Sequence, residues 1–391
     1  VDRRKERKKE MKHLDIGGSS FDRTFGCPGW LEASKGIAKN PAGPAAIKGS
    51  MHHEVQETCR KEDKVPDQLI GLVYKENGVE LEFTEDDLDL SEIGYDAVDA
   101  LLDEHDVDIM EIEPFVQIIP DVAGGSIDLL GVSHDDETMV EIDYKFGRVK
   151  VNPKNNKQML FYLMCARRDP VTADLFEGVK KFIVAIVQPQ CKGVTFTWEC
   201  SLAELDAFEV EAMEKIALAQ TEDAPRSPGS WCKYCPAAPY CDAKKFKVDE
   251  ALLITPTHKK ELQAAADIVE EVEEWVNAVK SELYAQVERG AKIKGWKLVE
   301  KVGKRAWIDA DNAETALKEA GLKMANISTT TLMTAPQIEK VLKKHKDIEF
   351  DFDSFVEKKS AGHTLAPEAD GRDAITTTGA PENLKKLMAK K

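Results

Sequence analysis

The chain has 391 residues, and its 42% hydrophobic and 32% charged residues are typical of a globular protein rather than a fibrous or wholly disordered one. At roughly 100–200 residues per domain, this length predicts two or three domains. No run approaches the 18 or so apolar residues of a membrane-spanning helix, and residues 1–12, with seven Lys and Arg, are too polar for a signal peptide. We therefore expect a cytoplasmic protein with no membrane partner.

The net charge of −17 is concentrated in one segment. Residues 80–113 contain 15 Asp and Glu and no Lys or Arg, which leaves 56 acidic against 54 basic residues elsewhere. Because phosphate binding depends on the local placement of Lys and Arg, the total charge does not exclude DNA as a partner.

Hydrophobic periodicity predicts alternating helices and strands after a basic arm or frayed terminus at residues 1–12. The predicted elements are a helix over 49–62, a hairpin within 69–83, one or two surface helices over 85–106, an antiparallel meander of three strands between 107 and 149, a helix over 155–167, strands over 181–188 and 194–199, and a helix over 202–220. This order is an α/β layer pattern.

Beyond Cys241 the pattern becomes mainly helical. The predicted elements are a long helix over 257–289, a hairpin over 296–307, and helices over 311–320 and 335–345. We predict a first domain over 1–247, a helical C-terminal domain with a small hairpin over 248–369, and a flexible tail over 370–391. The basic residues around this hairpin would either offer a path for DNA or form ordinary surface: Lys292, Lys294, Lys297, Lys301, Lys304 and Arg305.

Charged residues occur within two of the predicted strands. Asp128 lies in GGSIDLLGV, and VEIDYKFG follows with Glu141, Asp143 and Lys145 at alternate positions. Side chains two apart on a strand share a face, so these three should line up beside Asp128. An isolated D-x-K is usually a surface ion pair, but crowded carboxylates on an apolar strand favour a site for Mg²⁺ or Mn²⁺, with the Lys steadying a phosphate.

Two predicted helices carry polar pairs one turn apart. His53 and Glu57 occur in GSMHHEVQE, and Gln158 and Tyr162 occur in the helix that follows the D-x-K strand. Each pair alone is typical of an ordinary polar helix face.

The cysteine pattern is more specific. Cys232-x2-Cys235-x5-Cys241 lies in the turn SWCKYCPAAPYC, which suits chelation better than core packing. A fourth ligand would be Cys27, Cys59 or a more distant Cys, and the spacing allows either Zn²⁺ or a [4Fe-4S] cluster. The remaining cysteines fall in predicted helices and strands and are expected in the core: Cys165, Cys191 and Cys200.

Together these motifs resemble the PD-(D/E)xK nuclease superfamily, in its iron-sulfur RecB/AddB-like branch. The resemblance rests on Cys27, Gly49-x3-His53, Asp128, Asp143-x-Lys145, Gln158-x3-Tyr162 and the terminal cysteine turn, which occur in that family's order. CPGW, GSMHHEVQE, VEIDYKFGR, NNKQMLFYLMCA, VQPQ, KGWKLVEKVGKRAW and APEADGRDAI also resemble a phage and prophage family of such nucleases across nearly the whole chain. The resemblance implies a restriction-endonuclease-like α/β core with a mixed central sheet flanked by helices.

The resemblance also implies a role for each residue. Asp128, Asp143, the Tyr144 carbonyl and His53 would hold the metal, Lys145 would orient the water, and Gln158 and Tyr162 would brace the site. Cys27, Cys232, Cys235 and Cys241 would bind a [4Fe-4S] cluster that fastens the N-terminal segment to the end of the nuclease domain. Glu113 would be a further carboxylate, and the Glu141-x-Asp143 doublet leaves open which acid contacts the metal.

The implied activity is hydrolysis of DNA phosphodiester bonds in recombination, replication or DNA degradation, in the bacterial cytoplasm if the protein is phage-encoded. The sequence contains no G-x4-G-K-[ST] phosphate loop, so we expect no ATP-driven motor and favour an exonuclease acting on single-stranded or duplex ends. A catalytically degenerate DNA-binding or assembly module is the alternative. A third reading is a Zn-stapled interaction protein whose acidic segment 80–113 imitates DNA. Phage or host recombination proteins and a second copy of the chain are further possible partners.

Overall fold

The computed structural model describes residues 14–38, 43–76, 78–256, 258–300, 305–323, 327, 333–342, 348, 350–358, 363–367 and 373–375. The predicted arm at residues 1–12, Lys301, Lys304 and most of the predicted tail lie outside these residues. The chain divides into two compact units, Val1–Glu282 and Leu283–Lys391. This division falls within the helix Lys259–Glu288. The predicted domain boundary after residue 247 is not tested by it and stays a prediction.

The first unit is built on a five-stranded mixed sheet in the order β3-β6-β7-β8-β9. β7 and β8 are parallel, and the other neighbours are antiparallel. Two small hairpins, β1-β2 and β4-β5, lie outside this sheet. The strands are β1 Val73–Glu76, β2 Val79–Glu82, β3 Ile109–Ile112, β4 Phe115–Ile119, β5 Ala123–Ser126, β6 Leu129–Ser133, β7 Thr138–Tyr144, β8 Lys181–Val187 and β9 Thr195–Ser201.

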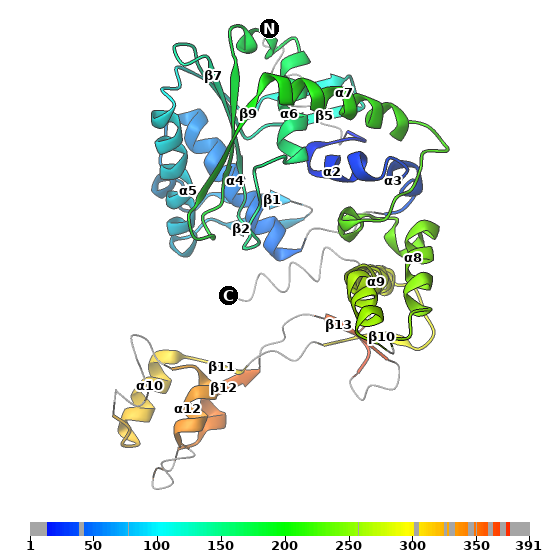
Figure 1. Ribbon diagram of the computed structural model, residues 1–391. Coiled ribbons are helices and arrows are strands. Elements are labelled where there is room, and N and C mark those ends of the chain that lie inside the picture. Colours follow the sequence, from blue (N-terminus) through cyan, green and yellow to red (C-terminus); the bar gives the residue numbers. More distant parts are fainter. Residues whose placement is uncertain are drawn as a thin grey trace. The chain divides into compact units, whose positions relative to one another are not determined.

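Helices cover both faces of the sheet, with α4 and α5 on one side and α6 and α7 on the other (Figure 1). This arrangement confirms the predicted mixed α/β class with a central sheet flanked by helices. The helices of the first unit are α2 Gly18–Gly26, α3 Trp30–Ala33, α4 Pro44–Glu62, α5 Glu85–Glu104, α6 Lys157–Arg168, α7 Leu202–Ala219 and α8 Asp242–Leu252, together with most of α9 Lys259–Glu288.

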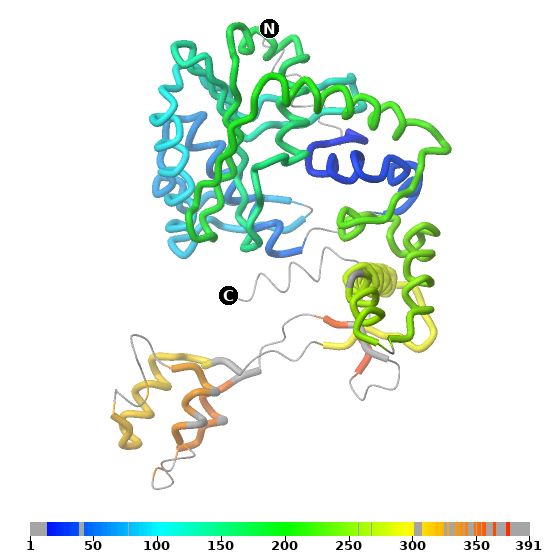
Figure 2. The backbone as a smooth tube through the Cα atoms, in the orientation of Figure 1, coloured from blue at the N-terminus to red at the C-terminus, as the bar shows by residue number. Residues whose placement is uncertain are grey.

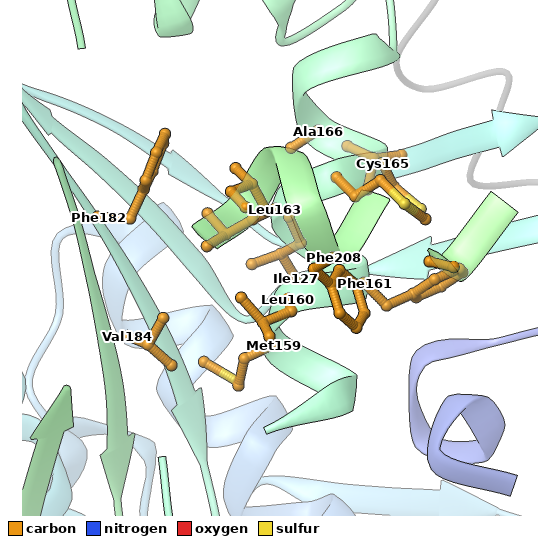
Figure 3. Close-up of a cluster of buried hydrophobic side chains, with 14 of the residues drawn as sticks. Ile127, Met159, Leu160, Phe161, Leu163, Cys165, Ala166, Phe182, Val184 and Phe208 are labelled. Atoms are coloured by element: carbon orange, nitrogen blue, oxygen red, sulfur yellow. The ribbon is translucent and has the colours of Figure 1, made fainter. Parts of the chain in front are cut away.

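Alternating side chains of β7 pack into two separate hydrophobic cores, one on each face of the sheet. Val140 and Ile142 pack with Val98 and Leu101 of α5 on one face. Met139 belongs to the larger cluster on the other face, where Phe182 and Val184 of β8 meet the apolar side of α6, including Met159, Leu160 and Leu163 (Figure 3). All seven residues of β7 are buried, so any charged side chain on this strand lies inside the protein.

One predicted strand arrangement is confirmed in part and another is wrong. The three predicted segments between residues 107 and 149 do form an antiparallel meander, β3-β6-β7, within the main sheet. The first predicted strand is divided into β3 and β4, however, and β4 pairs with β5 outside this sheet. The predicted hairpin over 296–307 is wrong, because β10 Trp296–Glu300 pairs with β13 His363–Pro367, and β11 Arg305–Trp307 pairs with β12 Val356–Lys358. Both differences concern which strand pairs with which, and local alternation does not specify that.

The second unit has its own small core. α10 Ala310–Glu319 and α12 Ala335–Leu342 accompany the strand pairs β10-β13 and β11-β12. Leu317, Leu322, Ile327 and Ile338 are its buried residues. In the part of the chain that the structure describes, no helix in either unit is long and apolar enough to span a membrane.

Candidate functional site

The D-x-K segment lies at the carboxyl end of β7. Asp143 is 5% exposed, and Lys145 is the first residue after Tyr144, the last residue of the strand. The Lys145 backbone N–H donates to the Val187 carbonyl of β8 at 2.9 Å, which continues the parallel pairing by one residue. Since β7 and β8 are parallel, their carboxyl ends meet at one edge of the sheet, where open α/β sheets usually place their ligands.

Asp128 lies beside this edge, one residue before β6. Its Oδ2 accepts a 2.7 Å hydrogen bond from the Tyr144 backbone N–H, which fixes the carboxylate against β7. His53 of α4 brings its Nδ1 to 3.3 Å from the same oxygen. α4, the start of β6 and the end of β7 therefore meet at one carboxylate, although His53 is 75 residues from Asp128 in the sequence.

Gln158 joins the D-x-K pair to α6. Its Nε2 donates to Asp143 Oδ1 at 2.6 Å, and its Oε1 accepts from Lys145 Nζ at 3.3 Å. Lys145 Nζ also lies 2.6 Å from Asp143 Oδ2. The Asn156 side chain caps α6 by accepting from the Gln158 and Met159 backbone N–H groups, so the cap places Gln158 in the first turn of the helix.

Tyr162 lies one turn further along α6, and two glycines allow its ring to fit. A Cβ on Gly18 would lie 2.2 Å from Tyr162 Cζ, and one on Gly125, which has φ +159°, would lie 3.0 Å from Cε1. The pKa of Tyr162 is raised well above its usual value by burial and by the nearby carboxylates of Asp143 and Asp128. The tyrosine therefore stays protonated beside the acids.

The site holds two carboxylate–cation pairs with different electrostatics. Burial alone would raise the pKa of Asp128, but His53 and Lys145 outweigh it and lower that pKa. Burial raises the pKa of Asp143 in spite of the Lys145 ammonium group. Burial also opposes the charged forms of His53 and Lys145, yet the neighbouring carboxylates raise both pKa values. Asp128 is consequently the more acidic of the two aspartates.

Glu141 lies two residues before Asp143 on the same face of β7. It is 1% exposed, and neither carboxylate oxygen has a hydrogen-bond partner. Its pKa is raised well above the usual value by burial and by repulsion from Asp143 and Asp128. The carboxyl group of Glu141 therefore favours the neutral form, whereas Asp128 keeps its charge.

The donor set fits an ion that takes few protein ligands. Within the described ranges, no three His, Cys, Asp or Glu side chains are arranged so that they could hold a metal ion. Mg²⁺ needs only one or two carboxylates because it keeps several of its waters. Asp128 and Asp143, with the orphaned Glu141 oxygens close by, supply that chemistry.

The sequence places two further carboxylates near this site, those of Glu113 and Glu57. The backbone N–H of Glu113 donates to the Asp128 carbonyl at 3.1 Å, so the residue adjoins the site between β3 and β4, with φ 52°. Glu57 lies within 2.6 Å of Lys61 one turn along α4, which is the ordinary helix-face pairing. A role in metal binding stays a prediction for Glu113.

The cysteine turn meets the N-terminal segment. Cys27, Cys232, Cys235 and Cys241 line one small cavity, together with Trp30 and Trp231. The blue segment containing α2 and α3 lies beside the green segment that follows α7 (Figure 2), and Gly29 N–H donates to the Pro225 carbonyl at 3.0 Å. Of the candidate fourth thiols, Cys59 is buried in another cluster, with Met51 and Phe83.

Backbone N–H groups point at two of these sulfur atoms. Ser227 N–H donates to Cys27 Sγ at 3.3 Å, and Gly229 N–H donates to Cys232 Sγ at 3.5 Å. Burial raises the pKa of both thiols. Thiols are the donors that a tetrahedral Zn²⁺ or an iron-sulfur cluster takes, and binding would release the thiol protons. In the described residues, however, the four sulfur atoms are not arranged as a group that could hold a metal ion.

Sequence reasoning did not identify the glycines around Tyr162 or the contacts behind His53. His52 is buried, stacks on Phe146 with ring centroids 4.8 Å apart, and its Nδ1 lies 2.8 Å from Ser91 Oγ of α5. The only available signals were the Gly-Gly pairs in DIGGSS and AGGS and the doubled histidine. None of these signals indicates which residue would be contacted, because all of the contacts join residues far apart in the sequence.

Comparison with known proteins gives a family for the chain. The family described as "Protein of unknown function (DUF2800)" matches residues 13–373. The chain belongs to this family. Among solved structures, the crystal structure of protein VC1899 from Vibrio cholerae is similar at 13% sequence identity, over 52% of this chain and 58% of that chain, with a TM-score of 0.17.

Proposed function

We propose that this DUF2800 protein is a metal-dependent deoxyribonuclease of the PD-(D/E)xK type. The observation that carries the proposal is the convergence of Asp128, Asp143 and Lys145 at the carboxyl edge of β7, with Gln158 bonded to both members of the D-x-K pair. A buried set of two acids and a lysine with perturbed pKa values is typical of a catalytic site. A surface ion pair would not need this burial.

The residues divide the work of phosphodiester hydrolysis among them. Asp128 and Asp143, with the Tyr144 carbonyl and His53, would hold Mg²⁺ or Mn²⁺, which supplies a water of lowered pKa and neutralises phosphate charge. Since its pKa is raised, Lys145 remains an ammonium ion. It therefore orients the water and stabilises the charge that develops on the phosphate, rather than accepting a proton. Gln158 holds Lys145 and Asp143 in register.

The four cysteines Cys27, Cys232, Cys235 and Cys241 would bind a [4Fe-4S] cluster, with Zn²⁺ as the less favoured occupant. A site closed by four thiolates contributes folding energy and leaves no open position for catalysis. The cluster is therefore assigned a structural role, in which it fastens Cys27 to the turn at residues 232–241.

An exonuclease is favoured over an endonuclease because the sequence contains no phosphate loop for a motor. DNA recombination, replication or degradation in a phage-infected bacterium is the proposed setting. A catalytically degenerate DNA-binding module is the alternative, but the buried charges argue against it, since loss of catalysis would remove the need for acids whose burial is unfavourable.

The test is cleavage of end-labelled single-stranded and duplex DNA with Mg²⁺ or Mn²⁺, with a closed-circular control. Asp143→Ala and Lys145→Ala should each reduce the rate by about 100-fold or more, as expected for groups that stabilise transition-state charge. Asp135→Ala is the matched control, because Asp135 is exposed in the turn at the opposite end of β7. Sparing of circles would identify an exonuclease.

Absence of metal-dependent cleavage in a protein that retains its iron would contradict the enzyme assignment and favour the binding module. Equal loss of cleavage in the Asp135→Ala control would show that the assay reports stability rather than catalysis.

A further inference from the structure

The loop between β7 and α6 begins and ends at the candidate active site. It covers residues 146–156 and is named here the basic loop. Lys145 precedes it and Gln158 follows shortly after it, and these two side chains are hydrogen-bonded to each other. The loop therefore forms part of the rim of the site by its connectivity alone.

The charge of this region is opposite to that of the whole protein. From residue 144 to residue 168 the chain has seven Lys and Arg and no Asp or Glu, although its net charge is −17. Arg148, Lys150 and Lys154 are exposed. Among the ion pairs of the described residues, none joins these three side chains to a carboxylate, whereas Lys180 at the opposite end of the same strands pairs with Glu137 at 2.6 Å.

Side-chain amides hold the basic loop in one conformation. Gln188, which is fully buried, donates from Nε2 to the Gly147 and Val149 carbonyls, both at 2.8 Å, and accepts from the Val151 N–H at 3.0 Å. Gln190 donates to the Phe146 carbonyl at 2.6 Å. These bonds satisfy the loop backbone from within, so the backbone is already ordered before binding and its ordering adds little to the entropic cost.

The exposed side chains suit a sugar–phosphate backbone. Val149 is 82% exposed and lies between the two cations Arg148 and Lys150. Arg148 Nε donates to Gln190 Oε1 at 2.8 Å, and Lys150 Nζ lies 4.0 Å from the centroid of the Phe196 ring, so both cations contact neutral partners rather than carboxylates. Cations of this kind bind phosphates without reading base sequence.

The surroundings of the basic loop give the bound strand a preferred side. Gly94 of the acidic helix α5 lies against Pro189 and Phe146, because a Cβ on Gly94 would be 3.2 Å from Pro189 Cγ. On the other side, Lys157 opens α6 with its Nζ 4.1 Å from the centroid of the Phe25 ring. A polyanion is repelled from α5 and attracted towards the start of α6.

We propose that the basic loop binds the phosphate backbone of the DNA strand next to the scissile bond, through Arg148, Lys150 and Lys154, independently of base sequence. The inference rests on the proposed function, since it assumes that DNA is the substrate. It adds the surface that carries the strand and the side of the site from which the strand approaches.

The test is DNA binding by the Asp143→Ala protein, in which cleavage is strongly reduced, using a fluorescent single-stranded oligonucleotide titrated at several salt concentrations. Adding Arg148→Ala and Lys150→Ala should weaken binding by about 10-fold or more and reduce the slope of log K against log salt by about 1.4, at roughly 0.7 per phosphate contact. Lys180→Ala with Lys181→Ala is the matched control at the opposite end of β7 and β8, and should change neither quantity.

Unchanged affinity and slope in the loop variant would overturn the inference, and so would a parent protein that binds no DNA. Cleavage by the wild-type protein is measured separately. If the wild type cleaves DNA while the loop variant binds as well as its parent, only the assignment of the loop fails and the nuclease assignment stands.

Discussion

The position of the Tyr162 ring depends on two neighbouring residues, Gly18 and Gly125, that have no side chain. Gly18 is the first residue of α2, and the N-terminal segment that carries it is docked on β5 by the bond from Gly124 N–H to the Ile16 carbonyl at 3.0 Å. The ring of Tyr162 therefore fits only because no side chain projects from position 18. Both the helix and the tyrosine must hold their places for the site to keep its shape.

Gly18→Ala should displace the Tyr162 ring, since the added Cβ would lie 2.2 Å from Cζ. Overpacking of this kind destabilises by about 1–3 kcal/mol, so we expect a lower melting temperature and slower DNA cleavage. Gly17→Ser is the matched control, because a Cβ there meets only the Gly124 carbonyl at an ordinary 3.7 Å, and Ser is a favourable N-cap residue.

A double substitution separates this clash from a general effect on α2. Gly18→Ala should cost little stability in a Tyr162→Ala background, where the ring is absent. If the alanine is as destabilising without the ring as with it, the contact with Tyr162 is not the cause.

At the scale of elements, a buried polar contact fastens α4, which carries His53, to the acidic helix α5. His52 lies 2.8 Å from Ser91 Oγ, and Gln56 donates to the Ser91 carbonyl at 2.7 Å. Burial lowers the pKa of His52 from 6.5 to about 4. The histidine is therefore neutral at physiological pH, and protonating it would place a charge inside this buried contact.

The sign of the pH effect follows from this shift. Below pH 6.5 the unfolded chain binds a proton at His52 that the folded protein does not accept until about pH 4. The stability contributed by this group is present above pH 6.5 and is lost as the pH falls towards 4, by up to about 1.4 kcal/mol per pH unit. His52→Phe keeps an aromatic ring on Phe146 and removes the titration, so its melting temperature should fall less steeply than that of the wild type between pH 6.5 and 4.5.

His258→Phe is the control for this measurement, because His258 is exposed and should leave the slope unchanged. Parallel melting curves for wild type and His52→Phe over the whole range would show that His52 is not the residue responsible.

The same scale shows how much of the fold local sequence can predict. Helices α4 to α7 and strands β7 to β9 were predictable because each carries a continuous period of its own. The run IMEIEPFVQII also alternates without a break, yet the structure divides it at Glu113, which has φ 52°, and Pro114. Proline lacks the N–H that a central strand needs. Pro114 therefore indicates a break between two strands at this point, in spite of the continuous alternation.

The candidate site was predictable to a similar extent. The period of a strand places Asp143 and Lys145 on one face without any knowledge of the fold. That Asp128 bonds to the Tyr144 N–H, or that Gln188 orders the basic loop, depends on which strands become neighbours. Such pairing is set by the whole core, so the residues of the site were visible in the sequence and most of their partners were not.

At the scale of the whole first unit, the cysteine cavity joins two distant parts of the chain. The segment that carries Cys27 continues from α2, whose first residue contacts Tyr162, and the turn at residues 232–241 leads into α8. A cluster bound by all four thiols would hold α2 at its C-terminal end while the contact with β5 holds the segment before its N-terminal end. Loss of the cluster should therefore reach the active site through α2.

Cys27→Ser should remove bound iron and labile sulfide from anaerobically purified protein and lower the melting temperature by several degrees, since metal binding supplies folding energy. Cys191→Ser is the matched control, because Cys191 lies outside the cavity and bonds only weakly, from Sγ to the Arg148 carbonyl at 3.6 Å. The control should retain iron and cleavage.

Iron content equal to wild type in Cys27→Ser would exclude Cys27 as a ligand. Zinc in place of iron in the wild-type protein would show that the four cysteines bind a different metal. If Cys27→Ser loses its iron but cleaves DNA at the wild-type rate, the cysteine cavity and the catalytic site are independent, and α2 does not transmit the effect.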